Sequence, residues 1–237
     1  MLQSLLIDGA RALGLDMTPA QAAQFERYHA LLTAANARMN LTRVPDDPRE
    51  AVDRNYLDCV AVLAHDFPAA RTAADVGSGA GFPGVPMAIM RPDIRFTLID
   101  ALDKRVAFLR TVIDELGLNA EALHLRAEDA GRASALREGF DLAVARAVAP
   151  MNVLCEYLLP LVRVGGHAVA LKGPTLPEEL AGAGPAIRLL GGAVERQVEL
   201  PMPGRDWDHR AAILRKVAPT PEKYPRKAGQ PEKKPLK

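Results

Sequence analysis

The run of residues 75–84, Asp-Val-Gly-Ser-Gly-Ala-Gly-Phe-Pro-Gly, has residue types that could bind a nucleotide. Gly77, Gly79 and Gly81 allow positive φ angles and have no Cβ, so a ligand can lie against their backbone. The apolar segment 72–76 before them suits a buried strand, and the two prolines after them suit the start of a helix. A strand, a glycine-rich turn and a helix N-terminus are typical of nucleotide sites in open α/β sheets. A tight strand-to-helix turn without a ligand is the alternative.

Acidic residues after the next two predicted strands could bind the same ligand. Asp100 ends a strand at 95–100, about 20 residues after the glycines, where a carboxylate can accept hydrogen bonds from both ribose hydroxyls. It could instead cap the helix that follows. Glu128 and Asp129 come just after a strand at 122–127, at the ligand edge of the sheet, where they could accept from an adenine amino group or cap the next helix.

Two nucleotide ligands are compatible with the glycine run. Gly79-x-Gly81-x-x-Gly84 fits the dinucleotide fingerprint, which would indicate a dehydrogenase. However, the first strand ends in Asp75, an acid at the position of a dinucleotide phosphate, and no Tyr-Lys or His-Asp arrangement stands out for hydride transfer. An anionic strand end suits the cationic centre and ammonium group of S-adenosylmethionine. The residues therefore favour a methyl donor.

Cationic residues follow the later strands at the same edge. Arg146 ends an apolar strand at 140–147, where its guanidinium could hold the donor's carboxylate or an RNA phosphate, or pair with the acids described above. Lys172 follows a strand at 166–172, and Arg210 lies near the start of a later one. Both are candidates for binding RNA through its phosphates.

An alternation of strands and helices must position these residues. Besides the strands above, helices are predicted at 103–116, 150–161 and 178–190, and segments 194–200 and 211–217 are close enough to pair as antiparallel strands. Strands that alternate with helices indicate a mainly parallel sheet with helices on both faces.

The first 66 residues are predicted to form a helical extension that packs on a main domain of residues 67–217. Thr18-Pro19-Ala20-Gln21 has the spacing of a capping box, and Asp47-Pro48-Arg49-Glu50 repeats that helix-start signal. Apolar residues follow each start at helical spacing.

The last 20 residues, 218–237, have a different composition. From Arg215 onward, eight cationic side chains stand against Glu222 and Glu232, and five prolines are interspersed. Such a segment should be extended and unable to fold alone. We expect it to contact nucleic-acid phosphates, with a solvated tail as the alternative.

The remaining composition excludes several classes. The chain of 237 residues has a net charge of +1 and no apolar run long enough to span a bilayer, and its N-terminus lacks a basic signal-peptide start. Cys59 and Cys155 are far apart, which fits reduced thiols in a cytoplasmic protein. The five histidines form no cluster, so we expect no metal site.

Several motifs together resemble the bacterial RsmG (GidB) family. In chain order they are Asn40-Leu-Thr42, Arg54-Asn-Tyr-Leu-Asp58, the run from Asp75 to Pro86, Lys104-Arg-Val-Ala-Phe-Leu-Arg110, Ala145-Arg-Ala-Val-Ala-Pro150, Leu171-Lys-Gly173 and Lys223-Tyr-Pro-Arg-Lys-Ala-Gly229. The matches run from about residue 36 to the end, and residues 1–17 match poorly.

The resemblance implies a class I S-adenosylmethionine-dependent methyltransferase, Rossmann-like, with a seven-stranded sheet. Its substrate would be N7 of a guanine in the decoding region of 16S ribosomal RNA. The implied partner is 16S ribosomal RNA or the small ribosomal subunit, without a membrane or a metal, and the chain is expected to be a monomer. Matched to the motifs, the donor contacts would be Gly77, Phe82, Asp100, Ala101, Leu102, Ala127, Glu128 and Arg146, beside Gly79 from the turn itself. The matching tail adds Lys223, Arg226 and Lys227 as RNA contacts.

This chemistry needs no catalytic side chain. Guanine N7 has an in-plane lone pair on the Hoogsteen edge, so no proton is removed before methyl transfer. We therefore assign no general base, and expect catalysis by alignment of N7 with the methyl group. The alternatives are another RNA or a protein as acceptor, a non-catalytic nucleic-acid-binding module with this fold and, last, a nicotinamide dehydrogenase.

Overall fold

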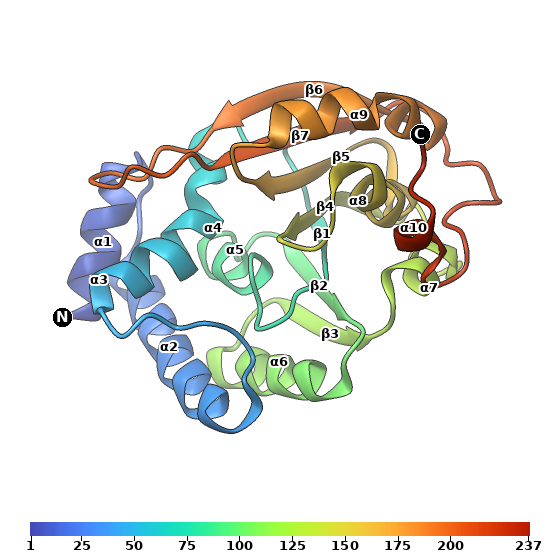
Figure 1. The fold of residues 1–237 in the computed structure, drawn as a ribbon. Helices are drawn as coiled ribbons and strands as arrows, with labels where there is room; N and C mark the ends of the chain where they lie inside the picture. Colours follow the sequence, from blue (N-terminus) through green and yellow to red (C-terminus); the bar gives the residue numbers. More distant parts are fainter.

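A seven-stranded sheet forms the centre of the computed structural model, which describes residues 1–237 (Figure 1). Its order is β3-β2-β1-β4-β5-β7-β6, and only β7 runs antiparallel to its neighbours. The strands are β1 (Thr72–Val76), β2 (Arg95–Asp100), β3 (Ala120–His124), β4 (Phe140–Arg146), β5 (Val162–Lys172), β6 (Gly192–Glu199) and β7 (Arg210–Lys216). The predicted mainly parallel seven-stranded sheet is confirmed.

The strand predictions hold with small differences at their ends. β1 and β2 have the predicted bounds, and all of their residues except the first of each strand are buried, as is typical of central parallel strands. β5 begins at Val162 instead of 166, since Val162 pairs with Phe140 before an irregularity in the ladder. β6 and β7 pair antiparallel as predicted. Because β7 lies between β5 and β6, β6 alone is the outermost strand on that side of the sheet.

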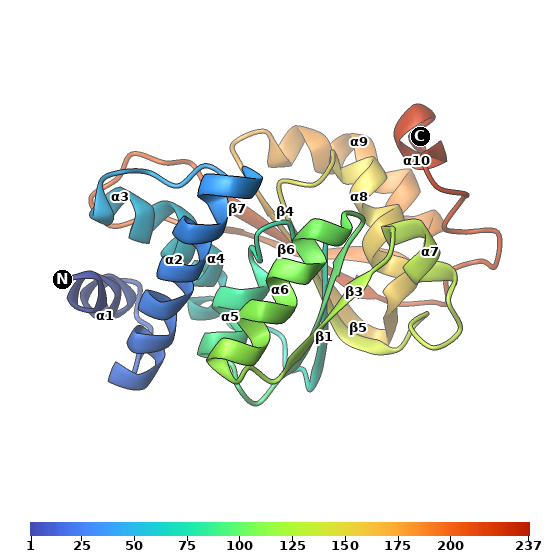
Figure 2. The same ribbon diagram turned by 90° about the horizontal axis from the view of Figure 1, so that it is seen from below.

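Helices cover both faces of the sheet, and each face has its own hydrophobic core (Figures 1 and 2). One core joins one face of the sheet to α5 (Gly84–Met90), α6 (Asp103–Leu116) and the N-terminal helices. The other joins the opposite face to α7 (Ala127–Arg132), α8 (Met151–Leu158), the 3₁₀ turn η3 (Leu159–Leu161) and α9 (Leu176–Leu189). This arrangement leaves the carboxyl ends of the parallel strands at one common edge.

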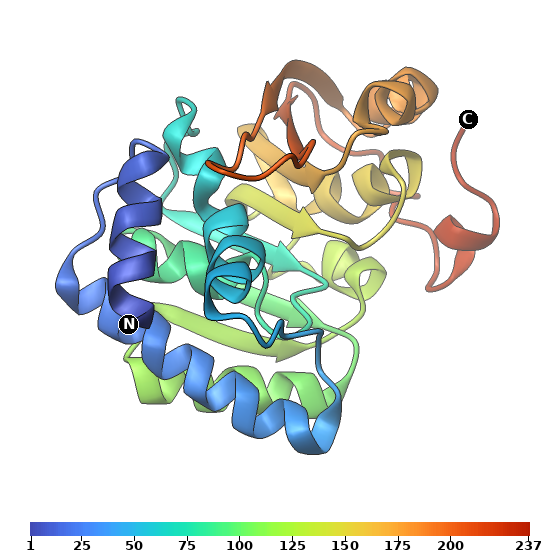
Figure 3. The ribbon, with the colours of Figure 1, turned by 60° about the vertical axis from the view of Figure 1, so that its left-hand side comes forward.

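The N-terminal helices are α1 (Leu2–Ala12), α2 (Pro19–Met39), α3 (Pro48–Ala51), the π-helical turn η1 (Val52–Leu57), α4 (Asp58–Val60) and the 3₁₀ turn η2 (Ala61–Ala64). The capping box at Thr18 and Gln21 is present at the start of α2. Figure 3 shows α2 alongside α6, in agreement with the contacts between these helices. The buried Tyr28 of α2 donates a hydrogen bond to the Ala80 carbonyl at 2.6 Å. The extension thereby supports the glycine turn directly.

The C-terminal segment differs from its prediction, because it is packed against α7 and α8 instead of extending as a free arm (Figure 1). It ends in a short helix, α10 (Gln230–Lys233). The buried Glu156 of α8 accepts hydrogen bonds from Arg226, including one from Nη2 at 2.6 Å. A fully buried carboxylate is costly without a cationic partner, so this pair fixes the segment to the domain. No helix is long and apolar enough to cross a membrane.

Candidate functional site

The glycine turn between β1 and α5 has the backbone that the sequence predicts. Gly77, Gly79 and Gly81 have φ angles of +72°, +60° and +110°. A Cβ on Gly77 would lie 2.8 Å from the Val148 side chain, and one on Gly81 would lie 2.7 Å from the hydroxyl of Tyr28. Glycine is therefore required both for the backbone conformation and for the space around the turn.

Asp75 of β1 stabilises this turn from its buried side. Its carboxylate is fully buried, and Oδ2 accepts a hydrogen bond from the Gly84 amide at 3.0 Å. Burial raises the pKa of Asp75 to about 7, against the lowering effect of its hydrogen bonds. The side chain does not line the neighbouring cavity. The prediction that Asp75 faces the ligand is wrong, because the helix start at Gly84 uses this carboxylate.

Asp100, at the end of β2, joins the turn to the next loop. Its Oδ2 accepts a hydrogen bond from the Gly79 amide at 2.8 Å, and its Oδ1 accepts one from the Leu102 amide at 2.9 Å. The guanidinium of Arg105 lies 3.5 Å from Oδ2. Because each carboxylate oxygen can accept two hydrogen bonds, both retain an acceptor position for a ligand.

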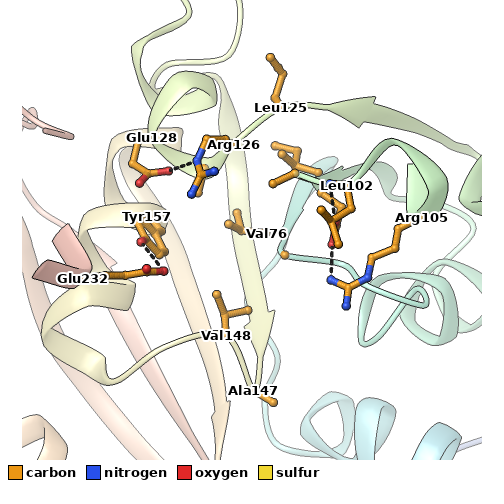
Figure 4. A pocket seen from close by; sticks show the side chains of 15 residues that line it. Val76, Leu102, Arg105, Leu125, Arg126, Glu128, Ala147, Val148, Tyr157 and Glu232 are labelled. Atoms are coloured by element: carbon orange, nitrogen blue, oxygen red, sulfur yellow. Dashed lines mark hydrogen bonds and ion pairs between the residues drawn. The ribbon is translucent and has the colours of Figure 1, made fainter. Parts of the chain in front are cut away.

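A first cavity of about 310 Å³ lies over the ends of β1, β2 and β4 (Figure 4). Apolar side chains, including Ile99, Leu102 and Leu125, give it room for a flat apolar group, while Asp100 and Glu128 supply acceptors. Six of the predicted donor contacts line it, namely Gly77, Asp100, Ala101, Leu102, Ala127 and Glu128.

The other three predicted donor contacts lie outside this cavity. Gly79 reaches it only through the hydrogen bond to Asp100. Phe82 is buried against the rings of Tyr28 and Tyr56, and the guanidinium of Arg146 lies 4.8 Å from the centroid of the Phe82 ring. Phe82 thus supports Arg146, a contact that no sequence pattern indicates.

A second cavity of about 450 Å³ adjoins the first. Ala147 lines both cavities, and its φ of +55° is unusual for a residue other than glycine. The three predicted rim cations, Arg146, Lys172 and Arg210, all line the second cavity. Its other cationic or titratable lining residues, which no sequence pattern singled out for a role, are Arg43, Arg54, Asp58 and His209.

Asp58 is the partner of Arg146, in place of the acidic pair after β3. Arg146 Nη1 donates to Asp58 Oδ2 at 2.8 Å and to the Arg54 carbonyl at 3.0 Å. The other oxygen of Asp58 lies 2.6 Å from His209 Nδ1. Burial acts to raise the pKa of Asp58, but His209 and Arg146 lower it overall, and the hydrogen bond to Asp58 raises the pKa of His209. One carboxylate thus orients two donors at the second cavity.

The other rim cations are partly neutralised. Lys172 Nζ donates to Glu179 Oε2 at 2.6 Å, and Arg210 forms two hydrogen bonds to Asp208, of 2.7 and 3.0 Å. Arg43 has no ion pair within the chain. The second cavity is nevertheless cationic, because five Lys or Arg side chains line it and Asp58 is the one acid among its lining residues.

Comparison with known proteins identifies the family of this chain. The profile of the GidB family, described as rRNA small subunit methyltransferase G, matches residues 21–203. The ribosomal RNA small subunit methyltransferase G of Clostridium perfringens is 45% identical over 95% of each chain. That of Lactobacillus johnsonii is 46% identical over 94% of this chain and 95% of its own length. The chain belongs to the GidB family. It is an S-adenosylmethionine-dependent methyltransferase, as the resemblance implied.

Solved structures agree with the fold of this GidB protein. A 16S rRNA (adenine(1408)-N(1))-methyltransferase from Catenulisporales acidiphilia aligns with a TM-score of 0.52 over 64% of this chain and 87% of its own, at 16% identity. Cofactor-bound Rv0187 from MTB aligns with a TM-score of 0.56 over 85% of this chain and 92% of its own, at 19% identity.

The residues that distinguish the second cavity of the GidB protein are carried by irregular backbone. Arg54 lies in the π-helical turn η1, and Asp58 follows that turn directly. Such turns occur often at functional sites, because they re-aim side chains within a helix. The motif Arg54-Asn-Tyr-Leu-Asp58 was visible in the sequence, but its role depends on Arg146 and His209, which are distant along the chain.

Proposed function

We propose that this protein transfers a methyl group from S-adenosylmethionine to N7 of a guanine in 16S ribosomal RNA, in the cytoplasm and as a monomer. The observation that carries the proposal is the pair of adjoining cavities over the carboxyl ends of the parallel strands. One is partly apolar and carries carboxylates, the other is cationic, and both are lined by Ala147. A small donor and a polyanionic acceptor need such neighbouring but different environments.

The first cavity fits the donor. When bound, S-adenosylmethionine supplies an activated methyl group on a sulfonium centre. Asp100 would accept hydrogen bonds from the ribose hydroxyls, and the apolar side chains of Leu102 and Leu125 would pack against the adenine. Gly77 would let the methionine part approach the backbone, because its positive φ and missing Cβ leave that space open.

The second cavity supports binding of the RNA. Arg146 retains Nε and Nη2 after its contacts with Asp58 and Arg54, so these donors can bind phosphate or the acceptor edge of guanine. Lys172, Arg210, Arg43 and Arg54 add positive charge around it. Among the tail residues, Lys223 and Lys227 are exposed and are proposed to contact RNA, whereas Arg226 is committed to Glu156.

No group in either cavity needs to act as a base. The N7 lone pair is the nucleophile, so the residues contribute by binding and alignment, which can lower the barrier by about 7–11 kcal/mol in well-oriented pairs. Only the short loop that contains Ala147 and Val148 separates the second, cationic cavity from the first. That spacing lets an acceptor base approach the donor while the RNA backbone stays among the cations.

Replacing Asp100 by Ala should weaken donor binding. The substitution removes the ribose acceptor and frees the Gly79 and Leu102 amides. We expect a loss of about 1.5–3 kcal/mol in the binding free energy of S-adenosylmethionine, the usual scale for hydrogen bonds to a charged group. Isothermal calorimetry without RNA measures it. Asp103→Ala is the control, since Asp103 is exposed, lies three residues away and does not line the cavity. Equal affinities for both variants would place the donor elsewhere.

The pH dependence should reside in RNA binding and not in chemistry. Asp58 raises the pKa of His209, so the imidazolium persists to a higher pH than that of an ordinary histidine. It is lost as the pH rises through that raised value. RNA affinity should therefore decrease from about pH 6 to about pH 9, while the single-turnover rate at saturating RNA stays flat. His209→Gln should flatten the affinity profile. A bell-shaped rate profile with an apparent pKa near about 7 would indicate a general base.

Two titrations separate the proposal from its alternatives. Calorimetry with S-adenosylmethionine and with NAD should show binding of the first only, and the reverse would support a dehydrogenase. Methyl transfer to RNA excludes a non-catalytic module. Transfer of label to another RNA or to ribosomal protein, with none to 16S ribosomal RNA, would support the remaining acceptors.

A further inference from the structure

The C-terminal segment reaches the edge of the first cavity. It lies beyond residues 21–203, the part of the chain that the family profile matches. Its residue Glu232 nevertheless lines that cavity, together with Tyr157 of α8. A segment predicted to reach out to RNA thus borders the proposed donor site.

Two sets of contacts fix the segment in this place. Arg137 donates to the Tyr224 carbonyl at 2.8 Å and to the Thr220 carbonyl at 2.7 Å. Arg226 then forms the ion pair with the fully buried Glu156. Because these anchors precede Gly229, they determine where the last turn of chain comes to lie.

From these anchors the chain turns toward the cavity. The Gly229 amide donates to Glu128 Oε1 at 2.7 Å, and the Tyr157 hydroxyl donates to Glu232 Oε1 at 3.3 Å. Figure 4 shows Glu128, Tyr157 and Glu232 together on one side of the cavity, opposite Leu102 and Arg105. The segment therefore supplies one side chain of this wall and orients another.

The charged side chains around the whole cavity select among ligands. Asp100, Glu128 and Glu232 all line the cavity, against Arg105 and Arg126. Three carboxylates repel the phosphates of a dinucleotide, whereas S-adenosylmethionine has cationic groups and hydrogen-bond donors without phosphate. Glu232 uses one acceptor position for Tyr157 and retains others.

We propose that residues 229–232 complete the methyl-donor site and that Glu232 is a donor-binding residue, accepting a hydrogen bond from an N–H or O–H of the adenosine part. This inference rests on the proposed function. Glu128 is positioned for the same task by the Gly229 amide, so the segment acts on donor binding and not on RNA alone.

The test measures donor affinity in the full chain without RNA. Glu232→Ala should weaken binding of S-adenosylmethionine about tenfold or more, and Glu232→Gln, which keeps an acceptor, should lose less. S-adenosylhomocysteine should show the same losses, because it retains the adenosine. Glu222→Ala is the matched control: it removes the same charge from the same segment, and Glu222 does not line the cavity. Both side chains are exposed, so unchanged melting temperatures are expected.

The outcomes distinguish the two proposals. If Glu232→Ala binds S-adenosylmethionine as tightly as the parent, the inference is overturned and the proposed function stands. An equal loss in Glu222→Ala also overturns it, because the effect would then be one of general charge. If the parent binds no S-adenosylmethionine, the proposed function fails and the inference with it.

Discussion

Replacing Gly77 by Val should abolish detectable binding of S-adenosylmethionine while most of the domain remains folded. A Cβ at this position would lie 2.8 Å from Val148, a residue that lines the first cavity, and the branched side chain would occupy space beside the turn. The backbone φ of +72° adds a cost of about 1–2 kcal/mol for any residue with a Cβ. Calorimetry and thermal unfolding measure the two effects separately.

Gly117→Val is the matched control for this substitution. Gly117 ends α6 with a φ of +59°, so valine incurs a similar backbone strain, but nothing lies within 4 Å of the added Cβ. Gly117→Val should therefore lower the melting temperature and leave the donor affinity unchanged. If Gly77→Val binds S-adenosylmethionine as the control does, the glycine turn is not the donor's binding surface.

Replacing Arg146 by Ala should reduce methyl transfer to RNA by about 100-fold or more, the scale expected when a charged contact and its alignment of the reactants are both lost. The guanidinium lies in the second cavity, between the ring of Phe82 and the carboxylate of Asp58. Because it does not line the first cavity, donor affinity should change by less than about threefold. Single-turnover kinetics and calorimetry distinguish the two effects.

Two further variants test the specificity of this effect. Asp58→Asn keeps the size of the partner but removes its charge, so it should lower methyl transfer by less than the loss of Arg146 itself. Arg163→Ala removes an arginine with a comparable ion pair, to Asp141, that lines neither cavity. It should leave transfer unchanged. A large loss of donor affinity in Arg146→Ala would instead assign Arg146 to the donor, as the resemblance implied.

Local signals were sufficient to predict the residues that line the first cavity, the proposed donor site. The glycines of the turn, the acid at the end of β2 and the residues after β3 are short-range features whose meaning follows from strand-turn-helix geometry. Helix α6 has the predicted bounds, since its apolar stripe and the glycine stop at Gly117 agree. In this part of the molecule, residues that are close in the sequence determine the local structure, so the sequence pattern predicts it.

The remaining features depend on contacts between distant residues. Asp58 and His209 are 151 positions apart, and nothing in the composition around either one indicates their hydrogen bond. Asp75 looked like a ligand contact because it ends a strand, yet it binds the Gly84 amide from below. Such partnerships are decided by packing, which the chain does not show locally.

The C-terminal segment illustrates the same limit. Its proline and lysine content is typical of disordered arms, so composition alone predicts an extended segment. It packs because α8 presents the buried carboxylate of Glu156 to Arg226, and because Arg137 binds two of its carbonyls. The partners of a segment, and not only its composition, decide whether it is ordered.

The most direct test of the central claim is to map N7-methylguanosine in 16S ribosomal RNA after incubation with the protein and methyl-labelled S-adenosylmethionine. Small subunits from cells that lack the protein provide the substrate, and parallel reactions use the naked RNA. We predict one new N7-methylguanosine in the decoding region with the parent protein and none with Gly77→Val. Label at another atom or in ribosomal protein, or no label while the donor binds normally, would contradict the account.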